Sequence, residues 1–169
     1  MKKFLLFLLF SVFIFKISIS QTSEKYKAVH IYRITQNINW RLNSQPEKYI
    51  ITVIGNSPIN WELNNVSKSA RATKPRIEIK KVSSVSKIGY THIVYIPKTK
   101  SSMINDIVQK LEGQKTIIIS DNVVIRSNGI DINLSYIENT LKLEINKNNI
   151  EQKGLKINEA IIANNLPYN

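Results

Sequence analysis

The residues that could do nucleophilic chemistry are two serines with suggestive neighbours. Ser84 stands three positions before Lys87, in the spacing S-x-x-K, and Ser120-Asp121-Asn122 has the form S-D-N. In one class of acyl-transfer enzymes these two patterns help to supply the nucleophile and its proton acceptor. The third pattern of that chemistry, K-T-G, is missing, and 169 residues are too few for that fold. We therefore interpret Asp121-Asn122 as the turn that ends a buried strand.

The residue types that bind metals or act as bases are few and scattered. His30 and His92 are the only histidines and stand 62 positions apart, so each is expected to be a hydrogen-bonded structural residue. No cysteine is present, which excludes thiol catalysis and cysteine-based metal sites. The twelve acidic residues are dispersed, and none of the five glycines forms a phosphate-binding motif. We predict no catalytic residue, no metal, no cofactor and a protein that is not an enzyme.

Strand and helix patterns alternate through the first two thirds of the chain. Tyr49–Ile54, Thr91–Ile96 and Thr116–Ile119 are short, β-branched and mostly apolar, which is typical of strands buried on both faces. In Arg76–Val82 isoleucines alternate with charges, which predicts a more exposed edge strand. Apolar spacings of three and four predict helices over Glu24–Trp40, after Ser57-Pro58, and over Met103–Leu111 with Ser101 or Ser102 as its cap.

The pattern changes in the last third of the chain. Ile130–Ile137 and Thr140–Ile145 alternate apolar and polar residues around a turn at Asn139, which predicts an antiparallel β-hairpin. Ile150–Gly154 is predicted to be a loop or short turn, and Leu155–Asn164 a closing helix. The predicted fold class is α/β: a mainly parallel sheet flanked by helices on both faces, with a C-terminal antiparallel β-hairpin and a closing helix.

A sheet of this kind offers one predictable place for a small ligand. Ligands of open parallel sheets bind in the crevice outside the carboxyl ends of the strands. The residues that would line this crevice are Gly55, Asn56, Pro97 and Asp121. The pattern therefore leaves open a function as a ligand-binding or sensor domain.

Residues Met1–Ser20 have the pattern of a cleaved secretory leader. A basic start precedes an apolar run from Phe4 to Phe15, which Lys16 ends. This run is about a dozen residues long, and a membrane-spanning helix needs roughly 20. We expect cleavage before Gln21, which leaves one α/β domain of 149 residues, 21–169, in the periplasm.

The chain is strongly basic, and the charge is unevenly spread. The formal net charge is +12, and loss of the three lysines of the leader leaves +9. Outside the cytoplasm this charge favours an anionic envelope surface or an acidic partner face, with no role in nucleic-acid binding. Positions 68–87 hold seven basic residues and only one acidic residue, Glu78, which predicts either a solvated face or a partner-binding surface. The candidate partner-binding residues are Lys68, Arg71, Lys74, Arg76, Lys80 and Lys81.

Two tryptophans are the remaining candidates for a functional surface. Trp40 ends the first predicted helix, and Trp61 lies beside the apolar stripe of the second. Either could anchor a partner or line a pocket. Because tryptophan is commonly mostly buried, we expect core packing for both.

Seven segments of the chain follow one another in a familiar order. They are Tyr26–Trp40 (a helix that ends in Trp), Tyr49–Gly55 (the first strand and its glycine), Thr91–Pro97 and Thr116–Asp121 (buried strands), Asn128–Ile132 and Leu141–Asn146 (the hairpin), and Gly154–Ile157 (the ending). Together they cover nearly the whole chain after the leader, and their order resembles that of a known family of exported bacterial proteins, the YfiR-like family. The chain departs from the family pattern where some members form disulfides, and at Trp40-Arg41 and Asn128-Gly129, where the family has Trp-Pro and paired glycines.

The resemblance implies an α/β fold, often in a homodimer, without catalytic residues. It implies a periplasmic regulator that binds the extracytoplasmic sensor domain of a membrane diguanylate cyclase, represses it, and so lowers cyclic di-GMP and biofilm formation. Similar domains also occur as sensor domains of histidine kinases, so both partner classes stay open. The alternative function is an extracytoplasmic small-molecule-binding sensor domain that feeds a histidine kinase or a transport system.

Overall fold

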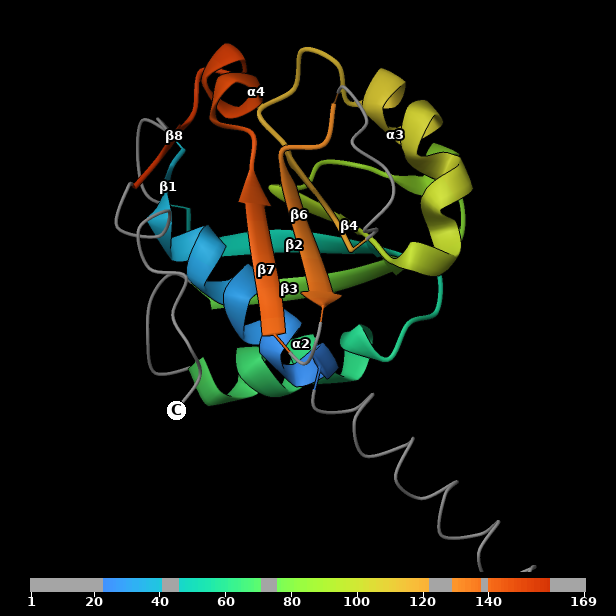
Figure 1. Ribbon diagram of the computed structural model, residues 1–169, viewed down its shortest axis with the longest axis vertical. Coiled ribbons are helices and arrows are strands. Elements are labelled where there is room, and N and C mark those ends of the chain that lie inside the picture. Colours follow the sequence, from blue (N-terminus) through green and yellow to red (C-terminus); the bar gives the residue numbers. More distant parts are fainter. Residues whose placement is uncertain (1–22, 41–45, 71–75, 122–128, 138–139, 159–169) are drawn as a thin grey trace, which may run out of the picture.

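Runs of β-branched residues form the centre of a six-stranded sheet (Figure 1). The computed structural model describes residues 23–40, 46–70, 76–121, 129–137 and 140–158 of the chain. Across the sheet the strands are β3 (Arg76–Val82), β2 (Lys48–Ile54), β4 (Ile93–Ile96), β5 (Ile117–Ser120), β6 (Ile132–Ile137) and β7 (Thr140–Ile145). Every residue of β4 and β5 is buried, and so is every residue of β2 after the first, as the apolar sequences of these strands predict.

The sheet is parallel except at one edge. Strands β3, β2, β4, β5 and β6 run parallel, and β7 pairs antiparallel with β6. The chain passes from β2 to β3 on one side and then to β4 on the other, so a topological switch point lies between β2 and β4. The predicted α/β fold with a mainly parallel sheet and an antiparallel hairpin is confirmed, and β3 is an edge strand as predicted.

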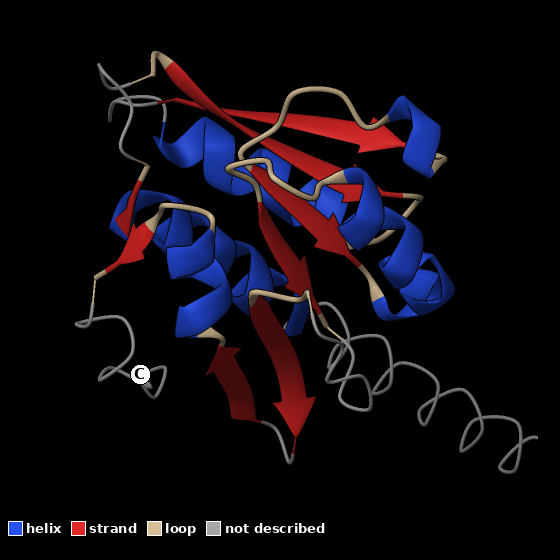
Figure 2. Ribbon diagram, turned by 90° about the horizontal axis from the view of Figure 1, so that it is seen from above, coloured by secondary structure: helices blue, strands red, loops and turns tan. Residues whose placement is uncertain are grey.

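Helices cover both faces of the sheet (Figure 2). On one face lie the helical segment 23–37, α2 (Ile59–Ser69) and α4 (Lys147–Gln152), which pack on alternate residues of β2, β4 and β5. On the other face lies α3 (Ile104–Lys110), which packs on the residues between them. The two clusters bury apolar surface on both sides, which is what holds a parallel sheet together.

The first helix is shorter than its sequence predicts. Residues 23–37 are helical, but Ile38–Asn39 forms strand β1, which pairs antiparallel with β8 (Lys156–Ile157). Asn158 N also donates to Asn37 O at 2.8 Å. The helix therefore ends before Trp40, because pairing with a distant segment outweighs the local helical spacing.

The C-terminal segment corrects two predictions. Where a loop or short turn was predicted at Ile150–Gly154, the chain forms α4, whose N-cap Asn146 accepts a hydrogen bond from Asn149 N at 3.1 Å. Where a helix was predicted from residue 155, Lys156–Ile157 is strand β8. Residues 159–164 and the predicted turn at Asn139 lie outside the described residues. The closing helix of the fold is α4.

The entry into α3 also differs from its prediction. A 3₁₀ turn at Lys98–Met103 leads into the helix, and neither serine side chain caps it. Ser101 Oγ instead donates to Lys98 O at 2.6 Å. The serine therefore stabilises the turn before the helix and leaves the helix itself without a side-chain cap.

Candidate functional site

The four predicted crevice residues follow three neighbouring strands. Gly55 and Asn56 follow β2, Pro97 follows β4 and Asp121 follows β5, so all lie at the carboxyl edge of parallel strands. Gly55 has a φ of 77°, and a Cβ at this position would lie 2.7 Å from Cε of Lys100. The Lys100 side chain therefore packs over Gly55, while Pro97 is buried and Asn56 is exposed. Their use as a ligand site stays a prediction.

Asp121 belongs to a buried ionic cluster with the N-terminal helical segment. Its Oδ2 accepts hydrogen bonds from Tyr95 Oη at 2.8 Å and from Lys27 Nζ at 3.0 Å. The same Lys27 Nζ donates to Glu24 Oε1 at 2.8 Å. The second oxygens of the two carboxylates, Asp121 Oδ1 and Glu24 Oε2, are buried and accept no hydrogen bond from the residues that the structure describes. One ammonium group thus joins the helix to the end of β5.

Burial and charge act against each other in this cluster. Burial acts to lower the pKa of Lys27, but Asp121 and Glu24 outweigh it, so this pKa lies above its ordinary value. Burial, and then the charge of Asp121, raises the pKa of the Tyr95 hydroxyl well above its ordinary value. Both groups therefore remain protonated donors at neutral pH and clamp the helix to the sheet.

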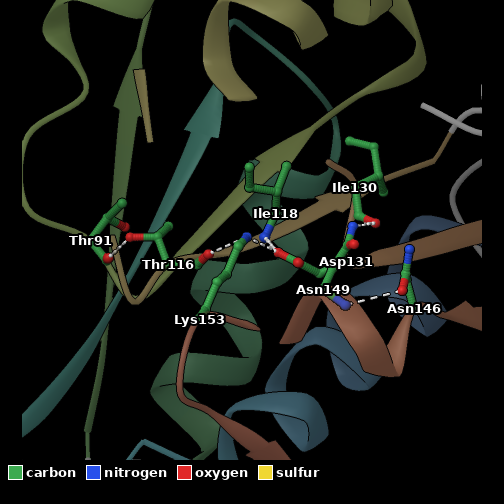
Figure 3. A network of polar contacts seen from close by, with 8 residues as sticks. All are labelled: Thr91, Thr116, Ile118, Ile130, Asp131, Asn146, Asn149 and Lys153. Atoms are coloured by element: carbon green, nitrogen blue, oxygen red, sulfur yellow. Dashed lines mark hydrogen bonds and ion pairs between the residues drawn. The ribbon is translucent and has the colours of Figure 1, made fainter. Parts of the chain in front are cut away.

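A second buried ion pair, Asp131–Lys153, joins α4 to the sheet (Figure 3). Lys153 Nζ lies 2.5 Å from Asp131 Oδ2 and donates to Thr116 O at 2.9 Å. The same Oδ2 accepts Ile118 N at 2.6 Å, and Asp131 is fully buried. Burial raises the pKa of the Asp131 carboxyl, and Lys153 and the Ile118 N–H offset part of this rise.

Two asparagines complete the network in Figure 3. Asn146 N donates to Asp131 O at 2.8 Å, and Asn149 Nδ2 donates to Ile130 O at 3.2 Å. These bonds fix the start of α4 next to the start of β6. The position of the hairpin therefore depends on the same polar network as the position of α4.

A cavity of about 580 Å³ lies between α3 and α4, beside the amino end of β5. Leu111 contributes to its apolar lining, and Lys115, Gln152 and Lys153 contribute polar groups. The volume falls within the range of small-molecule sites. Sequence reasoning missed this cavity because it predicted no helix at α4. Asn146, a favourable N-cap residue, was the signal that could have found it.

His92 is a buried structural residue, as predicted. Its Nδ1 accepts a hydrogen bond from Ile50 N at 3.0 Å, and its Nε2 lies 3.2 Å from Tyr90 Oη. The rings of Trp40 and Tyr49 meet it edge-on, with centroids 5.3 and 5.2 Å away. Burial lowers the pKa of His92, which favours the neutral imidazole. Core packing is confirmed for Trp40, which is 5% exposed.

Three of the predicted partner-binding residues lie on edge strand β3, and a fourth lies at the end of the neighbouring helix α2. We call Arg76, Lys80 and Lys81 of β3, together with Lys68 of α2, the basic edge. Lys80 pairs with Thr52 and Lys81 with Val53, so the two neighbouring lysines point to opposite faces of the sheet. Glu78 forms ion pairs with Lys48 and, at 3.7 Å, with Lys80. Arg71 and Lys74 lie outside the described residues.

The prediction of core packing is wrong for Trp61, which is 60% exposed. It lies on α2, where Ile59 and Leu63 supply the buried side. Lys68 follows Trp61 by seven positions, two helical turns, so both lie on the same exposed side of α2. Ser67 Oγ donates to Ile77 O at 2.8 Å and holds α2 along β3. An exposed aromatic residue therefore lies beside the basic edge.

A protein-family model described as YfiR/HmsC-like matches residues 24–163. The chain belongs to this family. Members of the YfiR/HmsC-like family are periplasmic, non-catalytic regulators of diguanylate cyclases and interact with a membrane sensor protein. A search of curated proteins gives no match.

The serine motifs of this YfiR/HmsC-like chain have ordinary structural surroundings. Ser84 Oγ lies 3.0 Å from Ser86 Oγ, and Lys87 Nζ donates to Ser83 Oγ at 3.4 Å. Ser120 is fully buried in β5.

Among the described residues, no three side chains of metal-binding type gather in one place, and no helix is long and apolar enough to cross a membrane. The predicted leader, Met1–Ser20, lies outside them.

Proposed function

We propose that this chain is a non-enzymatic periplasmic regulator that binds the extracytoplasmic sensor domain of a membrane diguanylate cyclase. Binding represses the cyclase, which lowers cyclic di-GMP and biofilm formation. Membership of the YfiR/HmsC-like family supports the kind of function. The observation that carries the surface is the basic edge with Trp61 exposed beside it.

The chemistry of this surface suits an acidic protein partner. An exposed tryptophan supplies a large apolar anchor, a residue type that often dominates binding energy at interfaces. Lysines around it steer an acidic surface toward the anchor and fix its orientation. In this surface the tryptophan would supply affinity, and the lysines would increase the association rate.

The mature charge of +9 fits the same location. In the periplasm the basic edge meets acidic ectodomains and the anionic envelope surface, and nucleic acid is not its partner. A histidine-kinase sensor domain would present the same kind of acidic surface, so the choice between the two output classes belongs to the experiment.

The direct test is capture of the partner from detergent-solubilised envelope, followed by association kinetics with its purified sensor domain. The double variant Lys80→Glu, Lys81→Glu should slow association at low salt, because two attractive charges become repulsive. Trp61→Ala should mainly speed dissociation, because it removes an anchor. Cells that carry either variant should contain more cyclic di-GMP.

Lys98→Glu with Lys110→Glu is the matched control. It makes the same change in net charge on exposed residues at the α3 side of the sheet. If the control slows association as much as the Lys80→Glu, Lys81→Glu variant does, the slowing reflects net charge alone, and the basic edge is not part of the interface. Binding to anionic vesicles with no captured protein would assign the edge to the envelope surface.

The cavity between α3 and α4 supports a second candidate function, a small-molecule sensor domain that feeds a histidine kinase or a transport system. A specific ligand would raise the melting temperature by mass action. Gln109→Trp, at an exposed lining residue on α3, narrows the cavity and should weaken the shift without changing partner capture. If no member of a panel of envelope metabolites shifts the melting temperature, this second function is rejected.

A further inference from the structure

The cavity between α3 and α4 is lined by polar side chains from both helices, which lie in the upper part of Figure 1. Asn105, Gln109 and Glu112 recur at intervals of three and four residues, so they form one side of α3 and of the turn that follows it. Asn149 and Gln152 are spaced in the same way on α4. The two helices therefore present hydrogen-bonding groups to a space of about 580 Å³.

Three of these polar groups are carboxamides that are available to a ligand. Asn105, Gln109 and Gln152 are exposed, and their side chains form no hydrogen bond with the part of the chain that the structure describes. Each carboxamide offers N–H donors and a carbonyl acceptor from a side chain that carries no charge. The cavity can therefore both donate hydrogen bonds to a ligand and accept them, without attracting a charge of either sign.

The charged groups of the cavity compensate one another. Lys153 Nζ donates to Thr116 O at 2.9 Å and is paired with the fully buried Asp131 (Figure 3). An ammonium group has three protons, so Lys153, whose side chain is 18% exposed, keeps one N–H beyond these two partners. Glu112 and Lys115 are exposed lining residues of opposite sign. Because an anion near Lys153 would also meet the Asp131 carboxylate, and a cation would meet the Lys153 ammonium, this N–H suits a neutral oxygen.

Apolar side chains complete the lining. Leu111 and Ile118 are buried lining residues, and Val108 is a half-buried one. A side chain at Gly129 would overlap that of Val108, so α3 packs closely against the backbone before β6 at this point. Apolar surface of this kind gains free energy when the C–H groups of a ligand cover it. The lining as a whole therefore suits a ligand that has both C–H surface and neutral hydrogen-bonding groups.

We propose that the cavity between α3 and α4 binds a neutral sugar ring. A pyranose has C–H groups on its faces and hydroxyl groups around its edge, and each hydroxyl both donates and accepts hydrogen bonds. The C–H groups cover Leu111 and Ile118, and the hydroxyls bind the carboxamides and the remaining N–H of Lys153. The inference rests on the second candidate function, because it names the class of ligand for the same cavity.

Pairs of sugars that differ in charge test the class of ligand. Glucose is compared with glucuronate, and N-acetylglucosamine with glucosamine, so the two members of each pair share a pyranose ring. A neutral sugar should raise the melting temperature of the chain, because it binds the folded state. Calorimetric titration should give this sugar a dissociation constant about tenfold or more below that of its charged counterpart, because the cavity holds no uncompensated charge.

Variants of the lining locate the bound sugar. The double variant Gln109→Leu, Gln152→Leu replaces two exposed carboxamides by apolar groups of similar size and should weaken sugar binding about tenfold. Asn64→Leu, the same kind of change at an exposed position of α2, is the matched control and should leave binding unchanged. Gln152→Lys adds a positive charge with no acidic residue three or four positions away, so it should shift the preference from glucose toward glucuronate. Thermal unfolding without sugar shows whether each variant keeps its fold.

The outcomes distinguish this inference from the functions proposed above. Stabilisation by the charged sugars alone, or sugar binding that the double variant leaves unchanged, overturns the inference. If another envelope metabolite raises the melting temperature and neither neutral sugar does, the inference is wrong and the sensor function stands. If no compound raises it, the sensor function is rejected together with the inference. Partner capture by the same variants reports separately on the regulator function, because the basic edge lies at the β3 edge of the sheet.

Discussion

The two edges of the sheet carry charge in different ways. β3 presents lysines and an arginine with one acidic residue among them, and β7 presents one lysine and one glutamate on the same face. A strand rich in one sign of charge repels its own copy and attracts an acidic surface. A strand with one charge of each sign has no net charge, so it offers an acidic surface little attraction. The charge pattern thus favours an acidic partner at the β3 edge and not at the β7 edge.

The ion pairs at the two ends differ as well. Near β7, Asp131 is fully buried beside Lys153, whose side chain is 18% exposed. At β3, Glu78 and Lys48 form an ion pair with side chains 34% and 56% exposed. Breaking a buried pair leaves a charge without solvent or partner, whereas an exposed pair exchanges its partner for water. The β7 end therefore holds the fold, and the β3 end is open to change.

The largest expected effect comes from breaking the buried pair. Lys153→Met should lower the free energy of unfolding at pH 7 by about 3 kcal/mol, because it leaves the Asp131 carboxylate buried without its ammonium partner. Lys48→Met, the same replacement at the exposed pair, should leave stability nearly unchanged. Urea unfolding of both variants measures the difference.

The double variant Asp131→Asn, Lys153→Met checks the cause. It also replaces the Asp131 carboxylate, which Lys153→Met leaves buried without an ammonium partner. The double variant should therefore recover part of the stability that Lys153→Met loses. A double variant as unstable as the sum of its single variants would mean that the two groups do not act as a pair. Equal losses for Lys48→Met and Lys153→Met would break the contrast between the edges.

The fold was largely predictable because each strand of the sheet can be recognised from a short stretch of its own sequence. The β-branched runs around Ile51, Val94 and Ile118, and the alternation of β7, each reflect burial that a short window of sequence records. α4 and β8 were missed for the opposite reason. α4 buries a single residue, Ile150, and β8 exists only because it pairs with β1, so neither leaves a periodic pattern.

The candidate sites divide in the same way. The basic edge was predictable, because its residues are close in sequence and charged residues remain exposed. The Asp131–Lys153 pair was not, because its members are 22 positions apart and only the fold brings them together. Trp61 shows the limit of residue averages: tryptophan is usually buried, but its place on α2 faces away from the stripe formed by Ile59 and Leu63.

The next effect in size is the difference between the two edges in partner association. Lys80→Glu with Lys81→Glu should slow association with the sensor domain about tenfold at low salt. Lys142→Glu, an exposed charge reversal on β7, should leave that rate nearly unchanged, because β7 lies at the opposite edge of the sheet. Surface-based kinetics on both variants compares the two rates. Equal slowing by both would show that the basic edge has no special place in the interface.

A smaller effect should separate the two lysines of the basic edge. Lys81 points to the face that α2 covers, the side of Trp61, and Lys80 points to the other face, where Glu78 lies 3.7 Å away. Lys81→Glu should therefore slow partner association about threefold at low salt, and Lys80→Glu less. Stopped-flow kinetics at two ionic strengths compares them. A larger effect from Lys80→Glu would move the interface to the opposite face of the sheet.

The smallest expected effect is a pH dependence of opposite sign at the two edges. The hydrogen bond and charge of Lys48 lower the pKa of Glu78, so its contribution to stability is present above the ordinary carboxyl pKa and is lost as pH falls; its exposure keeps this contribution small. Burial raises the pKa of Asp131, so the folded chain binds this proton more tightly than the unfolded chain. The contribution of Asp131 therefore falls as pH rises from about 4 through the raised value.

Urea unfolding between pH 4 and pH 7 tests both signs by differences between profiles. In the Asp131→Asn variant the decline of stability with rising pH should be absent. The free energy of unfolding of the variant should therefore increase relative to that of the wild type as pH rises, even if the substitution lowers stability by a constant amount at every pH. Glu78→Gln should run nearly parallel to the wild type and fall behind it slightly toward neutral pH. If the Asp131→Asn profile ran parallel instead, the carboxylate would be fully compensated by Lys153 and the Ile118 N–H. The buried pair would then resemble the exposed pair in its response to pH, and burial alone would no longer distinguish the two ends of the sheet.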